Sequence, residues 1–273
     1  MDSGSENLEE LVFSENIKVH KAESHLYDKV HHEIFNPTER RRLINEIQQL
    51  LPNGRGQLAM DFGCGTGNLT LILLKQGFNV VAVDISPDML SVLEEKFSTS
   101  IANGSLKTLK LAQGQKSVDW PTKFSAILMY SVLHHIYDVE GVLSGLCADL
   151  APDGILVIEH ETSEVYWQLQ KSLVYKMYMN SCTVLNLIDD RLHSIPRLFI
   201  DYRYSDYHML PETRINLNEV ARILESNGLE VTTHTYFLRR TRIPNPLHFL
   251  LAPFFSDMVC IVGRKSGSPR GHD

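Results

Sequence analysis

Between residues 57 and 159 the chain alternates between strand-like and helix-like segments, and this alternation constrains the fold more than any other feature. Short apolar runs that are typical of strands occur at 57–62, 79–84, 106–112, 124–130 and 155–159. Segments with helical spacing of apolar residues lie at 68–76, 87–97 and 139–150. Parallel strands need crossover helices, so the pattern predicts an α/β fold with a doubly wound, mostly parallel sheet.

The alternation is interrupted once and then resumes. Residues 163–211 are rich in Tyr, Leu and Met and fit no strand–helix unit, so we expect an inserted helical lid there. After it we expect a helix at 217–227 and strands at 229–237 and 257–263. Because Pro244, Pro246 and Pro253 disfavour a helical crossover between these strands, the last strand should be antiparallel.

The chain of 273 residues is expected to form one domain with additions at both ends. Residues 1–35 should hold a frayed polar tail, Met1–Glu10, and a further helix. The domain itself, including the lid, should span 36–265 and begin with a helix that has Pro37 in its first turn. Residues 266–273 should form a second polar tail.

Composition narrows the class of protein. With 26 basic and 33 acidic residues the formal net charge is −7, which disfavours binding of nucleic acid through its phosphates. Cys64, Cys147, Cys182 and Cys260 lie far apart, as expected of reduced thiols. No stretch reaches the roughly 18 apolar residues of a membrane span, and the acidic start is unlike a signal peptide. We therefore expect a cytoplasmic protein without an integral membrane segment.

The most specific motif is Asp61 to Gly67 (DFGCGTG), directly between an expected strand and an expected helix. Glycines there permit unusual φ values and let a ligand approach the backbone, and the helix presents free N–H groups to that ligand. The next strand ends at Asp84, whose carboxylate at the same sheet edge can accept both hydroxyls of a ribose. A dinucleotide-binding turn would need glycine in place of Asn68, so the spacing argues against NAD.

In these segments the chain resembles a class I S-adenosylmethionine-dependent methyltransferase of the small-molecule type. The resemblance rests on DFGCGTG (61–67), VVAVDISPDML (80–90), FSAILMYSVLHHIYD (124–138) and PDGILVIEH (152–160). It implies a Rossmann-like sheet of seven strands in the order 3-2-1-4-5-7-6, with strand 7 antiparallel. It also implies S-adenosyl-L-methionine as the cofactor and S-adenosyl-L-homocysteine as its product.

The same resemblance implies cofactor contacts at positions of this chain. Asp61 would help to hold the amino group, Asp84 would bind the ribose, and Ile85 and Met89 would line the adenine. Gln115 stands where the family usually has an acid that binds the adenine amine. The turn residues that would pack against the methionine part are Gly63, Cys64, Gly65 and Gly67.

Two further segments would cover the site. By the same resemblance, the leading helix at 16–32 would close over the cofactor, with Tyr27 as its aromatic hydroxyl. The lid is aromatic enough to form an apolar acceptor pocket. Its candidate residues are Tyr166, Trp167, Tyr175, Tyr178, Tyr202, Tyr204 and Tyr207.

Methyl transfer from a sulfonium is an in-line displacement, in which alignment of the two reactants supplies much of the acceleration. An acceptor that must lose a proton also needs a general base. His134 and His135, after the fourth strand, are the candidate catalytic residues, followed by Glu159, His160 and Glu161 after the fifth. Adjacent histidines on a helix or strand point their rings apart, so we expect no metal site.

Three functions stay open. The first is methyl transfer to O, N or C of a small, apolar or aromatic acceptor. The second is an RNA methyltransferase, which the net charge disfavours, and the third is a regulatory protein that binds the cofactor without turnover. Arg239, Arg240 and Arg242, followed by apolar residues, also leave open a peripheral membrane contact at 239–255, against a solvated loop.

Overall fold

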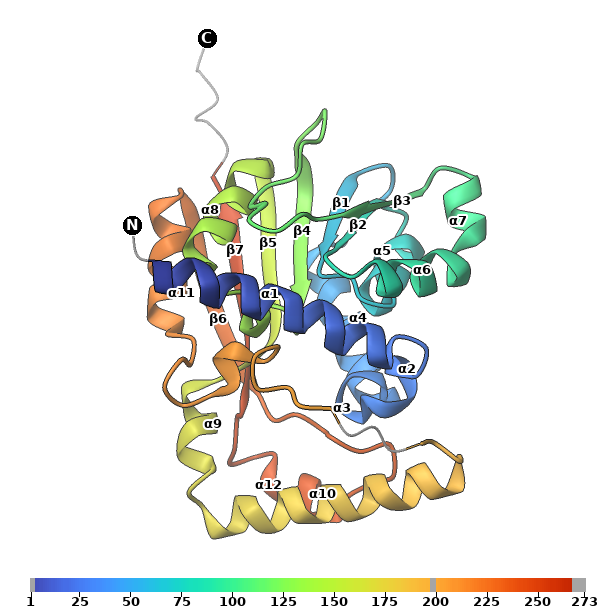
Figure 1. The fold of residues 1–273 in the computed structure, drawn as a ribbon, viewed down its shortest axis with the longest axis vertical. Helices are drawn as coiled ribbons and strands as arrows, with labels where there is room; N and C mark the ends of the chain where they lie inside the picture. The colour runs from blue at the N-terminus through green and yellow to red at the C-terminus, as the bar shows by residue number, and fades with distance from the viewer. Residues whose placement is uncertain (1–2, 197–199, 267–273) are drawn as a thin grey trace.

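Seven strands form one mixed sheet in the computed structural model, which describes residues 3–196 and 200–266 (Figure 1). The strands are β1 (Leu58–Phe62), β2 (Asn79–Asp84), β3 (Leu106–Lys110), β4 (Phe124–Tyr130), β5 (Leu150–Thr162), β6 (Leu229–Tyr236) and β7 (Met258–Lys265). Their order is β3-β2-β1-β4-β5-β7-β6. The first five pair in parallel, and β7 is antiparallel to both β5 and β6. The predicted fold class and strand order are confirmed.

The antiparallel strand follows from the connection that precedes it. Between β6 and β7 lies α12 (Pro246–Leu251), whose 6 residues are too few to carry the chain back along the sheet for a parallel pairing. Asn245 begins this short helix, because its side chain accepts a hydrogen bond from Leu247 N at 3.1 Å.

Helices cover both faces of the sheet. On one face, α8 (Val139–Asp149) and α11 (Leu217–Ser226) bury Leu146 and Leu224 against the strands. On the other face, α4, α5 and α6 bury Leu43, Leu73 and Leu93. These helices span Pro37–Leu50 (α4), Asn68–Lys75 (α5) and Pro87–Lys96 (α6). The short helix α7 (Ser98–Ala102) follows α6. The carboxyl ends of β1, β4 and β5 remain open to ligands between these layers and the amino-terminal helices.

The amino-terminal segment is more ordered than the sequence suggested. Helix α1 (Ser3–Glu23) runs obliquely in front of the sheet and leads into α2 (Tyr27–Val30) and α3 (His32–Phe35) (Figure 1). The expectation of a frayed tail at 1–10 is wrong from Ser3 onward, and residues 1–2 lie outside the described residues. Tertiary contacts hold the helix: Val12 and Val19 are buried, and the Asn16 amide donates to the carbonyl of His135 at 3.3 Å.

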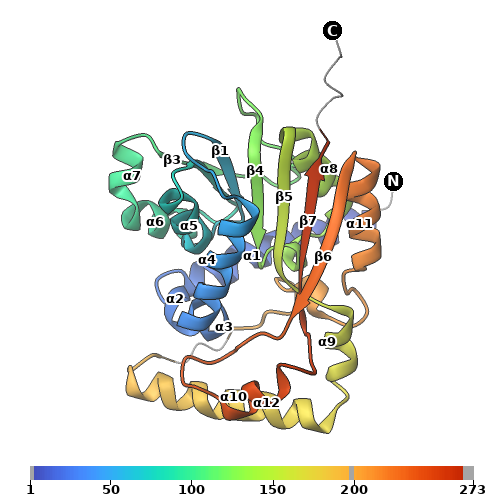
Figure 2. The ribbon, with the colours of Figure 1, turned by 180° about the vertical axis from the view of Figure 1, so that it is seen from behind.

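The inserted segment forms a small core of its own below the carboxyl ends of the strands (Figures 1 and 2). It contains α9 (Glu164–Leu169), α10 (Leu173–Leu192) and the 3-10 turn η2 (Tyr207–Met209). Tyr175 and Tyr178 of α10 are fully buried against Phe237 and the α12 region. Residues 197–199 of the expected lid, and all but Ser266 of the expected carboxyl-terminal tail, lie outside the described residues.

Candidate active site

The glycine turn between β1 and α5 lines a cavity at the carboxyl edge of the sheet. Gly63, Gly65 and Gly67 all have positive φ, at +73°, +49° and +92°. A Cβ on Gly63 would lie 2.5 Å from the Val132 side chain, whereas a Cβ on Gly65 would meet nothing within 4 Å. The turn therefore needs glycine for its backbone, and at Gly65 it faces free space that a ligand can occupy.

Two carboxylates lie beside this turn. Asp84, at the end of β2, accepts hydrogen bonds from Gly65 N and Ser86 N, both at 2.8 Å. Asp61, at the end of β1, accepts one from Thr70 Oγ1 at 2.5 Å. Burial raises the pKa of both groups, that of Asp61 to about 7. Each carboxylate is thus oriented by the backbone or a hydroxyl and keeps lone pairs for a further donor.

The cavity also contains buried polar atoms that have no protein partner. The amide nitrogen and oxygen of Asn68, at the start of α5, are buried without a hydrogen bond, and so is the amide oxygen of Asn16. Both side chains line the cavity. Unpaired buried polar atoms are costly, so they indicate a place for a polar ligand. Two carboxylates, the unpaired amide of Asn68, the unpaired amide oxygen of Asn16 and an open glycine suit the amino, hydroxyl and carboxylate groups of S-adenosylmethionine.

Most of the residues that the sequence assigned to the cofactor line this cavity. They are Tyr27, Asp61, Gly63, Cys64, Gly65, Asp84, Ile85 and Gln115. Gly67 and Met89 do not line it. Met89 is buried within α6, and its backbone N–H is 3.3 Å from the capping hydroxyl of Ser86. Gly67 instead leaves room for the Phe97 ring, which a Cβ there would approach to 2.5 Å.

A second cavity adjoins the first and shares five lining residues with it, namely His20, Tyr27, Ile34, Ser131 and His135. Its other lining residues come from the amino-terminal helices, the ends of β4 and β5, the inserted segment and the start of the β6–α12 connection. Charged and aromatic members among them are Glu23, His31, Glu33, Tyr166, Tyr202 and Asp206. Of the seven lid aromatics proposed from the sequence, only Tyr166 and Tyr202 line this cavity within the described residues. The acid and histidine density of residues 20–33 is the sequence signal that could have revealed part of it.

Backbone strain marks the strand ends beside the second cavity. Ser131 follows β4 with φ +60°, and His160 lies near the end of β5 with φ +66°. The β5–β7 register shifts between Ile158 and Glu161, so the strand bulges at His160. Residues in the left-handed region cost about 1–3 kcal/mol and cluster at functional sites. The bulge also redirects Glu161 toward the turn that follows β4.

Glu161 fixes the first histidine of the pair. One of its oxygens accepts from Val132 N at 3.0 Å and Leu133 N at 2.7 Å, and the other lies 2.9 Å from His134 Nδ1. Burial alone would lower the pKa of His134, but the Glu161 carboxylate raises it above its ordinary value. His134 lines the second cavity but not the first. The contact with Glu161 therefore favours the protonated form of the His134 ring.

His135 has the opposite character. Its Nδ1 lies 2.7 Å from the carbonyl oxygen of Ser205, which can only accept, so Nδ1 carries the hydrogen. Burial and the neighbouring His134 and His20 lower the pKa of His135 well below its ordinary value. The ring is therefore neutral near pH 7, with a free lone pair on Nε2. Because His135 lines both cavities, its ring lies at their shared boundary.

The expectation that the two rings point apart is wrong. His134 and His135 lie on a 3-10 turn, η1 (Leu133–His135), where neighbouring side chains are not on opposite faces, and their ring centroids are 4.0 Å apart. With Asp206 they form one of two groups, among residues 3–196 and 200–266, whose ligand atoms lie within 4.8 Å of one another, close enough to hold a metal ion. The other group is Glu46, His234 and Cys260, at the junction of α4, β6 and β7.

His31, which also lines the second cavity, lies between two carboxylates. His31 Nδ1 is 2.9 Å from Glu33 Oε1, and His31 Nε2 is 3.3 Å from Glu23 Oε2. The Tyr202 hydroxyl donates to Glu23 at 2.8 Å. Burial opposes ionisation of both groups, but the hydrogen bonds raise the pKa of His31 to about 10 and lower that of Glu33 to about 2. The hydrogen bond from Tyr202 joins this cluster of the amino-terminal helices to the inserted segment.

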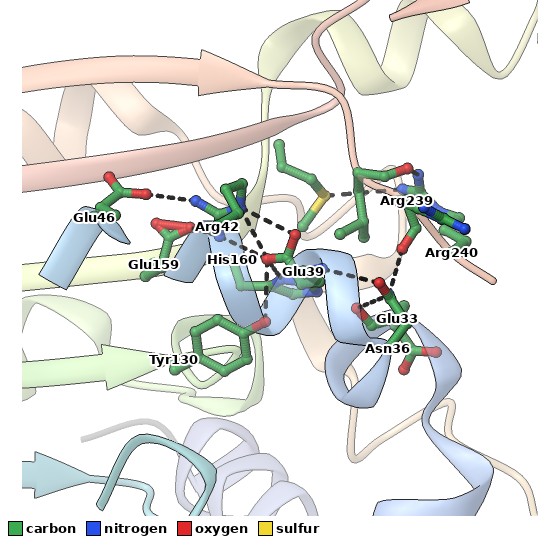
Figure 3. Close-up of polar contacts among 12 residues, drawn as sticks. Glu33, Asn36, Glu39, Arg42, Glu46, Tyr130, Glu159, His160, Arg239 and Arg240 are labelled. Carbon is green, nitrogen blue, oxygen red and sulfur yellow. Dashed lines mark hydrogen bonds and ion pairs between the residues drawn. The ribbon is translucent and has the colours of Figure 1, made fainter. Parts of the chain in front are cut away.

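A buried charge network supports the site from behind (Figure 3). Arg42 of α4 lies between Glu39, Glu46 and Glu159, and donates to Glu39 and Glu159 at 2.6 Å. His160 Nδ1 is 3.7 Å from Glu39 Oε1. The network therefore ties α4 to the strained end of β5 and fixes where His160 enters the second cavity.

The four cysteines are buried and free, and no helix among residues 3–196 and 200–266 is long and apolar enough to cross a membrane. The family profile described as a methyltransferase domain matches residues 33–234, which include the glycine turn, the ends of β1 and β2 and the whole inserted segment. The chain belongs to this family. Membership confirms the expected class of S-adenosylmethionine-dependent methyltransferases, and with it the cofactor.

Individual relatives match shorter stretches. An uncharacterised methyltransferase of Schizosaccharomyces pombe is 31% identical over 108 residues, which cover 38% of this chain and 38% of that protein. A ubiquinone biosynthesis O-methyltransferase of Methylococcus capsulatus is 32% identical over 102 residues, covering 36% of this chain and 40% of that protein. The chain thus spans about two fifths of the length of these curated relatives.

A solved structure extends the similarity over most of the chain. It is phosphoethanolamine N-methyltransferase 2 of Haemonchus contortus in complex with S-adenosyl-L-methionine, with a TM-score of 0.59. The sequence identity is 15%, and the match covers 90% of this chain and 57% of that one. At this identity the similarity supports the fold.

Proposed function

We propose that the chain transfers the methyl group of S-adenosylmethionine to a hydroxyl group of a small aromatic acceptor bound in the second cavity. The observation that carries the proposal is the shared boundary of the two cavities, where Tyr27, Ser131 and His135 face both. A cofactor in the first cavity and an acceptor in the second would lie next to each other at this boundary. Alignment of the two reactants supplies much of the acceleration of a displacement.

The first cavity would hold the cofactor, which supplies an electrophilic methyl group when bound. Asp84, oriented by Gly65 N and Ser86 N, would accept the ribose hydroxyls. Asp61 would face the amino group, and Asn68 would complete its hydrogen bonds with the carboxylate end. Ile85 and Gln115 would lie against the adenine. We leave Gly67 and Met89 out of these contacts because they do not line the cavity.

His135 would act as the general base. Its Nδ1–H donates to Ser205, which fixes the tautomer, and its depressed pKa keeps Nε2 unprotonated near neutral pH. As the acceptor oxygen bonds to the methyl group, its proton would pass to this Nε2. His134, held at 2.9 Å from Glu161, would instead position the turn.

The lining of the second cavity supports a polar aromatic acceptor rather than a purely apolar one. Tyr166 and Tyr202 offer ring surfaces, while Glu23, Glu33 and Asp206 accept hydrogen bonds from hydroxyl groups. A relative named for O-methylation in ubiquinone biosynthesis supports the same acceptor class.

The test has two stages. Calorimetry should give micromolar binding of S-adenosylhomocysteine, with a raised melting temperature, and no binding of NAD. Incubation with methyl-labelled S-adenosylmethionine and a panel of phenols and catechols, followed by mass spectrometry, should then yield methyl ethers. NAD binding alone would refute the cofactor assignment. Binding of S-adenosylhomocysteine with labelled amines, labelled tRNA or no product at all would refute the hydroxyl acceptor.

A further inference from the structure

Two neighbouring helices at one end of the molecule expose an unusual number of large apolar side chains. On α10 these are Leu173, Val174, Met177, Val184, Ile188 and Leu192, with exposed fractions from 44% to 73%. On and beside α12 they are Phe249, Leu250 and Phe254, with exposed fractions from 62% to 79%. Both helices lie along the lower edge of the molecule, below the carboxyl ends of the strands (Figures 1 and 2). Single exposed apolar residues are ordinary, but a contiguous group of this size marks an interaction surface.

The exposed side chains of α10 form a second apolar face. The first face, with Tyr175, Tyr178 and Cys182, is buried against the α12 region. Met177 and Leu173 are four residues apart, as are Ile188 and Val184, so these four side chains align on a different side of the helix. A surface helix needs one apolar face to pack on its own protein. The second face of α10 stays exposed among the described residues.

The charges around this surface are basic, although the chain as a whole carries −7. Lys171, Lys176 and Arg191 are exposed on or beside α10. The two acids of α10 are both paired with other side chains. Asp189 is buried and lies 3.3 Å from Arg242, and Asp190 lies 2.8 Å from His32.

The segment around α12 also carries positive charges. Residues 239–256 contain Arg239, Arg240 and Arg242 and no acid. Arg240 is paired with Asp257 and Arg242 with Asp189, so Arg239 is the arginine of this segment that has no ion pair among the described residues. Exposed apolar residues bordered by cations match the surface of an anionic bilayer, where apolar side chains enter the acyl boundary and cations meet the headgroups. We infer that α10 and the α12 region form a docking surface for an anionic lipid membrane.

This surface lies close to the second cavity. The Tyr178 hydroxyl of α10 donates to the carbonyl of Leu238 at 3.0 Å, and Leu238 and Arg240 line that cavity. Docking would therefore hold the acceptor side of the protein toward the membrane. The inference itself rests on α10 and α12 and does not depend on the proposed acceptor.

The test is co-sedimentation of the full chain with vesicles of phosphatidylcholine alone or with added phosphatidylserine. Binding should be at least about tenfold tighter with phosphatidylserine and should weaken with salt. Met177→Glu with Ile188→Glu should reduce the affinity at least about tenfold, since two charges would enter the apolar boundary. Ile101→Glu, an exposed apolar position on α7, is the matched control and should bind as the parent chain does.

Two further measurements keep the inference falsifiable. Binding of S-adenosylhomocysteine should be equal in all variants, which shows that the altered chains are folded. Lys171→Glu with Lys176→Glu should lower binding to phosphatidylserine vesicles and leave binding to phosphatidylcholine unchanged. Absence of vesicle binding, equal loss in the Ile101→Glu control, or a self-association in sedimentation velocity that Ile188→Glu abolishes without any vesicle binding would overturn the membrane assignment.

Discussion

The two cavities that meet at His135 are built in different ways. The cofactor side includes the ends of β1 and β2, where the backbone of the glycine turn is itself held by Asp84, together with segments that follow β3 and β4 and residues of the amino-terminal helices. The acceptor side gathers residues from the amino-terminal helices, two strand ends, the inserted segment and the β6–α12 connection. Its geometry depends on contacts between elements, such as His31 with Glu23 and His135 with Ser205.

The difference suggests which changes will be local. A substitution on the cofactor side should alter affinity for S-adenosylhomocysteine and leave the remaining structure in place. A substitution on the acceptor side should alter turnover, or the stability of the contacts between elements, with less effect on cofactor affinity. The predictions below test this separation.

The largest effect is expected for His135→Ala. Loss of a general base lowers turnover about 10²–10⁴-fold. Because the ring forms only part of the cofactor cavity, affinity for S-adenosylhomocysteine should change less than about fivefold, or roughly 1 kcal/mol. Steady-state kinetics with a phenolic acceptor, together with calorimetry, measure the two quantities.

The control is His193→Ala, since His193 is exposed at the end of α10 and lines neither cavity. It should retain full turnover. If His135→Ala lost cofactor affinity and turnover to the same degree, the two sides of the site would not be separable and the general-base role would be wrong.

The next effect is expected for Asp84→Ala. A carboxylate that accepts ribose hydroxyls contributes about 1.5–3 kcal/mol, so affinity for S-adenosylhomocysteine should fall about 10- to 150-fold. Asp88→Ala, on the next helix and outside the cavity lining, should bind as the parent chain does. Circular dichroism checks that both variants are folded. An unchanged dissociation constant for Asp84→Ala would mean that the ribose lies elsewhere.

The same separation explains what the sequence could predict. The strands, the sheet order and the glycine turn with Asp84 follow from local periodicity and from glycine positions that the backbone requires. Met89 lies only five residues after Asp84, but it is buried within α6 and does not line the cofactor cavity. Even on the cofactor side, motif spacing predicts the backbone better than it predicts individual side chains.

On the acceptor side the missing information is long-range. The order of α1 depends on contacts such as Asn16 with His135, which the polar start of the chain does not reveal. Likewise, Glu33 and Asp206 reach the second cavity only through the packing of the amino-terminal helices and the inserted segment. The 3-10 turn that brings the rings of His134 and His135 together has no strong sequence signal.

A smaller effect should separate backbone strain from ligand contact. Gly65 and Gly56 both have positive φ, +49° and +74°, and a Cβ on either would meet nothing within 4 Å. Alanine at each position should therefore cost a similar amount of stability, about 1–2 kcal/mol. Only Gly65 lines the cofactor cavity, so only Gly65→Ala should also weaken S-adenosylhomocysteine binding, by roughly tenfold.

Thermal melts and calorimetry on the two glycine variants decide this prediction. Equal losses of cofactor affinity in Gly56→Ala and Gly65→Ala would attribute the effect to general destabilisation. An unchanged affinity in Gly65→Ala would mean that no part of the cofactor approaches the turn at that residue.

The last effect is on stability alone and concerns the ionic contact between His31, Glu23 and Glu33; its sign follows from the pKa values. The pKa of His31 is raised from 6.5 to about 10, so its contribution to stability is complete below pH 6.5 and is lost as the pH rises through 10. The pKa of Glu33 is lowered from 4.5 to about 2, so its contribution is complete above pH 4.5 and is lost as the pH falls through 2. His31→Gln should therefore destabilise the protein most between pH 4.5 and 6.5, by about 1–3 kcal/mol.

Urea unfolding of the parent chain and of His31→Gln across the pH range measures this difference, which should shrink toward both extremes. Lys18→Gln, which removes an exposed ion pair with Glu15, should give a difference below about 1 kcal/mol at every pH. A difference for His31→Gln that did not vary with pH would show that the ring acts by packing alone and that no ionic contact joins His31 to Glu23 and Glu33.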